Sequence, residues 1–182
     1  CPDFKPGRHP YHHAGAFYSQ EPSASSAAPL LGVRPGMRVL DLCAAPGGKS
    51  SQLAAALQGQ GLLVSNEYVA ARAEILKSNL ERMGVSNAVV LHGTPARIAA
   101  ALPEFFDRVL VDAPCSGAGM FRKEPAALAQ HCEALVQQCA ALGAQILDNA
   151  AAVQTLNAGN VAASICDFPA HALHCCLFST SA

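Results

Sequence analysis

Two apolar runs in this sequence each end in an acidic residue that is followed by a turn of small residues. The first run ends at Asp41 and is followed by LCAAPGGKS (42–50), and the second ends at Asp112 and is followed by APCSG (113–117). Continuous apolar runs are typical of strands that are buried on both faces of a parallel sheet. Because the carboxyl ends of parallel strands lie at one edge, we expect both strand ends to present polar groups to the same crevice, where open α/β sheets bind ligands.

Strand-like and helix-like segments alternate along the chain. Strands are expected at residues 38–42, 62–66, 88–91 and 108–112, with a further candidate at 160–165, and helices at 49–58, 69–83 and, as one or two helices, 125–153. This alternation predicts an α/β domain with a doubly wound, mostly parallel sheet.

Composition divides the chain into three parts. Residues 1–30 are rich in Pro, His, Ser and Ala and form a lead-in that we expect to lie across the sheet edge. Residues 31–168 are expected to form the core, and residues 169–182 an irregular tail. Because the chain begins with Cys1 and stops soon after its last interpretable element, we interpret it as a fragment.

Composition and charge exclude several classes of protein. With 182 residues, 51% hydrophobic and 14% charged, the chain is long enough for a core and too apolar to be disordered. It has no apolar run of membrane-span length and no signal-peptide pattern, which predicts a cytoplasmic protein with no membrane partner. The eight scattered cysteines are interpreted as reduced thiols. A formal net charge of -1 argues against binding nucleic acid by bulk electrostatics, so any RNA contact must be local.

The turn at residues 45–48 follows a strand and precedes a helix. Such a turn exposes backbone N–H groups beside a helix N-terminus and suits a carboxylate, a phosphate or a sulfonium-linked amino acid. Glu67 follows the glycines by about 20 residues, the spacing at which a carboxylate bonds ribose hydroxyls. The alternative is that Gly47 and Gly48 only allow close helix–strand packing and that Glu67 caps the next helix.

The strings DLCAAPGGKS (41–50) and DAPCSGAGMFRK (112–123) resemble the Sun-type RNA cytosine-5 methyltransferases, most closely the bacterial RsmF-like ribosomal RNA branch. The string YSQEPSA (18–24) is also similar to the lead-in of that family. The resemblance extends from about residue 9 to residue 152, and it implies a Rossmann-like methyltransferase core that lacks its last strands after residue 170.

The resemblance also implies S-adenosylmethionine as the cofactor. Its binding residues would be Cys43, Ala44, Ala45, Pro46, Gly47, Gly48, Lys49, Glu67, Thr94 and Asp112. Within this set, Glu67 would bind the ribose and Thr94 would lie near the adenine. Since the family often has Asp at the position of Thr94, we expect weaker adenine selection.

Carbon 5 of cytosine is a poor nucleophile, so its methylation requires a thiolate that first adds to carbon 6. The resemblance assigns Cys115 to assisting product release, and Asp112 to holding N3 of the base. A second cysteine of the family attacks the ring, and Cys166 in ASICDFP (163–169) is the matching candidate. The neighbouring Asp167 is expected to raise the pKa of this thiol and lower activity.

Two further features each have two interpretations, and a third group was considered as a metal site. Lys49, the fourth catalytic candidate, either faces the cysteine pair or extends to solvent, and residues 121–123 (Phe-Arg-Lys) either contact RNA or form a solvated helix start. The cysteines and histidines at 166–176 do not match zinc-ligand spacing, so no metal site is predicted.

These features predict an S-adenosylmethionine-dependent RNA cytosine-5 methyltransferase acting on ribosomal RNA, with transfer RNA as the second choice. The alternative is a catalytically inactive fragment that binds S-adenosylmethionine, or an RNA-associated domain that is not an enzyme.

Overall fold

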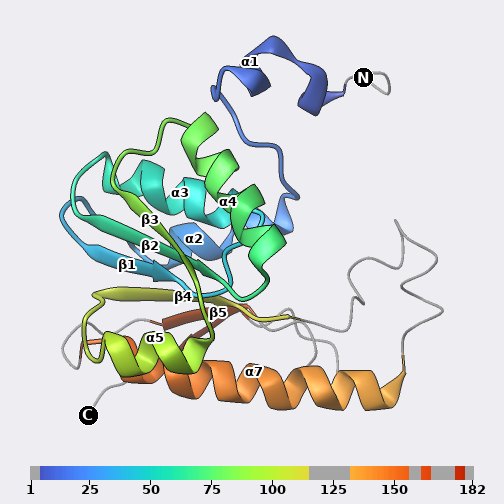
Figure 1. Ribbon diagram of the computed structural model, residues 1–182, viewed down its shortest axis with the longest axis vertical. Coiled ribbons are helices and arrows are strands. Elements are labelled where there is room, and N and C mark those ends of the chain that lie inside the picture. Colours follow the sequence, from blue (N-terminus) through green and yellow to red (C-terminus); the bar gives the residue numbers. More distant parts are fainter. Residues whose placement is uncertain (1–4, 115–131, 156–160, 165–174, 179–182) are drawn as a thin grey trace.

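The computed structural model describes residues 5–114, 132–155, 161–164 and 175–178, which build a sheet with helices on both faces (Figure 1). The strands are β1 (Arg38–Asp41), β2 (Leu62–Glu67), β3 (Ala88–His92), β4 (Arg108–Asp112), β5 (Val161–Ser164) and β6 (Cys175–Phe178). Their order across the sheet is β3-β2-β1-β4-β5-β6. The pairs from β3 to β5 are parallel, and β6 is antiparallel to β5. The predicted strands and the further candidate strand at 160–165 are therefore confirmed.

Helices cover both faces of the sheet, as a doubly wound fold requires. In Figure 1, α3 (Gly48–Leu57) and α4 (Ala70–Arg82) lie above the sheet, and α5 (Pro95–Ala101) and α7 (Glu133–Val153) lie below it. The strand residues alternate between these two layers. Val39 packs with Leu53 and Leu57 of α3, whereas its neighbour Leu40 packs in the cluster that holds Ile146 of α7.

The tail differs from the expectation at one place. The tail was expected to be irregular, with no strand after residue 170. Cys175–Phe178 nevertheless forms β6. Its register pairs Ser164 with Cys175 and Val161 with Phe178. The physical reason is that β5 would otherwise present unpaired backbone groups at the sheet edge, and a short apolar segment satisfies them.

The lead-in lies against the sheet as well as against the helices above it, since residues 27–30 contact β5 and the Leu31 carbonyl accepts from Nε of Arg108 in β4. It consists of η1 (Pro6–Arg8), α1 (Pro10–His13), η2 (Ser23–Ser25) and α2 (Ala27–Leu30), and it lies over α3 and the end of α4. Buried residues Ala27, Ala28 and Leu31 pack in the same cluster as α3. That cluster also holds Val39, Leu63 and Leu110 of the sheet, so these residues of the lead-in are buried between α3 and the sheet.

The described part of the chain holds no helix that is both long enough and apolar enough to span a bilayer.

Adjacent leucines test whether the lead-in is part of the core. Leu31 is 0% exposed, whereas Leu30 is 46% exposed. Leu31→Ala should lower the free energy of unfolding by about 2–5 kcal/mol because it leaves a cavity in the core cluster that holds α3. The matched variant Leu30→Ala should change it by about 0.5 kcal/mol or less. Urea denaturation measures both, and equal small losses would contradict a lead-in that belongs to the core.

Candidate functional site

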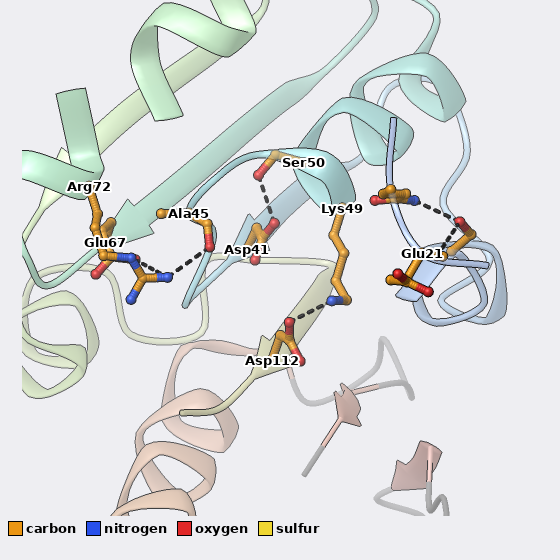
Figure 2. A network of polar contacts seen from close by, with 10 residues as sticks. Glu21, Asp41, Ala45, Lys49, Ser50, Glu67, Arg72 and Asp112 are labelled. Carbon is orange, nitrogen blue, oxygen red and sulfur yellow. Dashed lines mark hydrogen bonds and ion pairs between the residues drawn. The ribbon is translucent and has the colours of Figure 1, made fainter. Parts of the chain in front are cut away.

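Charged side chains gather at the carboxyl ends of β1, β2 and β4, as Figure 2 shows. Asp41, Glu67 and Asp112 end these strands, and Lys49 stands in the first turn of α3. The prediction that the two apolar runs converge at one edge is therefore confirmed, because β1 and β4 are parallel neighbours.

An ion pair joins the two motifs at this edge. The Nζ atom of Lys49 lies 2.5 Å from Oδ2 of Asp112. The Lys49 side chain is 15% exposed, so the interpretation that it extends to solvent is wrong. The interpretation that Lys49 faces the cysteine pair stays a prediction, because Cys115 and Cys166 lie outside the described residues. Residues 121–123 also lie outside them.

Asp41 does not face the crevice, contrary to the expectation for the first acidic strand end. It is fully buried, and its Oδ2 atom accepts a hydrogen bond of 2.7 Å from Ser50 Oγ. Ser65 Oγ in turn donates to Ser50 Oγ over 3.0 Å, and Oδ1 of Asp41 has no hydrogen-bond partner. Asp41 therefore ties α3 to the sheet from below.

Burial changes the acidity of this carboxyl group. Desolvation raises the pKa of Asp41 from 3.8 to about 7, and the negative charge of Asp112 also raises it. The hydrogen bond from Ser50 and the positive charge of Lys49 oppose this shift and lower the pKa.

The two glycines of the turn are in close contact with neighbouring elements. Gly47 has a φ of 112°, and a Cβ atom there would lie 3.2 Å from Leu76 Cδ1. A Cβ atom on Gly48 would overlap Gln20 Oε1 and lie 3.0 Å from Tyr18 Cε1. Both glycines therefore allow close packing, but against α4 and the lead-in and not between a helix and a strand as the alternative supposed. The first N–H groups of α3 nevertheless lack a side-chain cap, which leaves them available to a ligand acceptor.

Glu67 bonds the residue before α4 but does not cap that helix, whose first N–H groups have no side-chain cap. Its Oε1 atom accepts from the backbone N–H of Val69, the residue before α4, over 2.9 Å. Its Oε2 atom lies 3.7 Å from Nη2 of Arg72, which also donates to the carbonyl of Ala45 over 3.0 Å (Figure 2). A carboxylate has about four acceptor positions, so these contacts leave Glu67 able to accept from hydroxyl groups as well.

Sequence reasoning missed the residues that hold the turn from α4. Arg72 bonds the Ala45 carbonyl, and Asn79 Nδ2 donates to the Pro46 carbonyl over 2.8 Å. Their spacing of seven places them on one helical face with Leu76, which packs against Gly47. That spacing was the available signal.

Asn66 was also missed, and it joins two loops of the site. The side-chain Nδ2 atom of Asn66 donates to the carbonyls of Leu42 and Gly93, each at 3.1 Å. Its backbone carbonyl accepts a hydrogen bond from Ala44 N–H. Its Oδ1 atom is buried without a hydrogen-bond partner. Asn66 thereby fixes the turn after β1 relative to the loop after β3.

Two residues predicted to bind the cofactor, Cys43 and Thr94, have side chains that are buried or hydrogen-bonded within the protein. Desolvation, with the charges of Asp41 and Glu67, raises the pKa of the Cys43 thiol to about 12, so this thiol stays protonated. The Thr94 hydroxyl accepts from Arg97 N–H over 3.2 Å and caps α5. Among the described residues, no group of three or more His, Cys, Asp or Glu is arranged to hold a metal ion.

Comparisons with known proteins agree with this geometry. Residues 28–171 match the model of the family described as 16S rRNA methyltransferase RsmB/F. The chain is 44% identical over 133 residues to ribosomal RNA small subunit methyltransferase F of Pectobacterium atrosepticum, covering 71% of this chain and 27% of the relative. It is 42% identical over 143 residues to the protein of the same name from Cronobacter sakazakii, covering 76% and 29%.

Two solved structures share the fold. A methyltransferase homologue from Pyrococcus horikoshii matches with a TM-score of 0.77 and 28% identity, covering 90% of this chain and 50% of that one. NSun6 from the same organism, determined with SFG, matches with a TM-score of 0.79 and 21% identity, covering 90% and 41%. The chain thus spans less than a third of the length of the two curated relatives.

The buried carboxyl group gives a testable pH dependence. Between its ordinary pKa of 3.8 and about 7, folded Asp41 keeps a proton that the unfolded chain releases, so its contribution to stability falls as the pH rises through this range. Asp41→Asn should remove that fall, whereas Asp148→Asn, at an exposed position of α7, should not. Urea denaturation across this pH range gives the slopes, and equal slopes for wild type and Asp41→Asn would contradict the assignment.

Proposed function

Because the chain belongs to the 16S rRNA methyltransferase RsmB/F family, we propose that it is the core of an S-adenosylmethionine-dependent enzyme that methylates carbon 5 of cytosine in ribosomal RNA. The observation that carries this proposal is the ion pair of Lys49 with Asp112, which brings the two motifs together beside the uncapped start of α3.

The site fits the proposed cofactor. Uncapped N–H groups at the start of α3 suit its carboxylate, and the Glu67 carboxylate has acceptor positions left for ribose hydroxyls. Residues 43–49 would supply the turn, with Thr94 toward the adenine and Asp112 beside the sulfonium. NSun6 from Pyrococcus horikoshii was determined with SFG, an analogue of S-adenosylmethionine, which supports the choice. When bound, the cofactor supplies a methyl group attached to a sulfonium.

The chain's own residues would prepare the base. The Cys166 thiolate adds to carbon 6 of cytosine, which raises the electron density at carbon 5. The Lys49 ammonium group holds the Asp112 carboxyl group in place beside the base. Asp112 would then take up a proton and donate it in a hydrogen bond to N3, which stabilises the negative charge that develops on the ring. After methylation, a base takes the proton from carbon 5, the electrons of that C–H bond re-form the double bond between carbons 5 and 6, and Cys166 leaves as its thiolate, a step that Cys115 assists. The base must leave its stack to reach this edge.

Cofactor binding and methyl transfer test the proposal separately. Calorimetry with S-adenosylmethionine should give binding, and Glu67→Gln should weaken it about 10-fold because a charged hydrogen-bond acceptor is lost. Glu74→Gln, an exposed change on α4, is the matched control. Incubation with 16S ribosomal RNA should yield 5-methylcytosine. Binding of S-adenosylmethionine without methylated product would favour the non-enzymatic alternative. Methylation of transfer RNA alone would change the assigned substrate from ribosomal RNA to transfer RNA.

The two thiols have different expected phenotypes. Cys166→Ala should abolish methylation because no thiolate then reaches carbon 6, whereas Cys115→Ala should trap a covalent adduct with RNA. Denaturing gel electrophoresis distinguishes bound from free RNA, and Cys132→Ala, at an exposed thiol, is the control. Free RNA with both variants would refute the scheme of two cysteines.

A further inference from the structure

We infer that Arg82 is a positioning residue, which holds the turn at residues 44–48 in place through both α4 and the lead-in. Arg82 is the last residue of α4, at the far end of that helix from Arg72, and it makes none of the direct contacts to the turn. The inference deepens the proposed function, and the part of its test that measures binding of S-adenosylmethionine rests on that function.

Arg82 acts on the turn first through Asn79. Its Nη2 atom donates to Asn79 Oδ1 over 3.4 Å. Since an amide oxygen accepts and an amide nitrogen donates, this bond directs Nδ2 of Asn79 toward the Pro46 carbonyl, 2.8 Å away. Removing the guanidinium group would leave the amide free to rotate.

Arg82 acts second through the lead-in. Its Nη1 atom donates to the His12 carbonyl, and its guanidinium carbon lies 5.9 Å from the centre of the Tyr18 ring. A Cβ atom on Gly15 would overlap the Arg82 carbonyl, so the lead-in backbone lies directly against the end of α4. Gly15 also has a φ of 73°, which favours glycine.

The same lead-in segment supports the turn from its other side. Tyr18 and Gln20 occupy the space beside Gly48, where no Cβ atom fits. Gln20 is itself held, because its Nε2 atom donates to Ser25 Oγ over 2.9 Å. Arg82 therefore orients one support of the turn, Asn79, and anchors the other, the lead-in.

A fixed turn matters for binding because its N–H groups must point at the ligand before the ligand arrives. A residue that only stabilises the fold would lower the melting temperature without changing the affinity of the folded protein. A positioning residue changes the affinity and the local opening of the turn at temperatures where the protein is fully folded.

The test compares Arg82→Met with Arg97→Met, which removes an exposed arginine from α5. Arg82→Met should weaken binding of S-adenosylmethionine about 10-fold and speed amide hydrogen exchange by a similar factor at Ala44 and Ser51, whose N–H groups bond the carbonyls of Asn66 and Gly47. Arg97→Met should change neither. Arg82→Lys, which cannot hold two acceptors and the ring together, should give an intermediate loss.

Arg82→Lys serves as the test variant if Arg82→Met folds poorly, and Asn79→Leu tests the route through Asn79. If Arg82 acts partly through Asn79, the double variant should lose less than the product of the two single losses. Wild-type exchange and affinity in Arg82→Met, or fully independent losses, would overturn the inference. Because exchange is measured without cofactor, absence of binding by the wild type would count against the proposed function and leave the exchange result as the test of Arg82.

Discussion

The buried hydrogen bond between Ser50 and Asp41 fixes how α3 starts over the sheet, and the rest of the site depends on it. A carboxyl group that is fully buried is costly, so the fold retains it only with a polar partner, and Ser50 provides that partner. Successive residues of a helix are about 100° apart around its axis. With Ser50 directed down at β1, Lys49 is turned toward β4, where it meets Asp112.

The turn between β1 and α3 consists mainly of small residues, and hydrogen bonds from neighbouring elements hold its conformation. Arg72 and Asn79 bond two of its carbonyl groups from α4, and Asn66 bonds a third at Leu42. These bonds occupy the acceptors of the turn, while its donors at the start of α3 stay uncapped. A turn with satisfied carbonyl groups and uncapped N–H groups is suited to an anionic or polar ligand.

The sheet and the edge that carries the site could be predicted because apolar runs and small-residue turns are local signals. The contacts that hold the turn could not, since Arg82 and His12 are 70 positions apart and nothing in either segment marks the pair. The contacts of the lead-in could not be predicted in detail, because apolar residues in a short segment show that it is buried without showing which elements bury it. The role of Asp41 was missed for a similar reason: a strand-end acid facing a crevice and one facing a helix look alike in sequence.

The charges of the site explain how a chain with a formal net charge of -1 can present an acidic edge to the RNA substrate proposed for it. Glu67 is paired with Arg72 and Asp112 with Lys49, while burial raises the pKa of Asp41 to about 7 and so removes part of its charge near neutral pH. The carboxyl groups needed to bind a ribose and a base are thereby balanced where they stand. A phosphate backbone can then approach this edge without strong repulsion, although the chain as a whole carries no excess of cations.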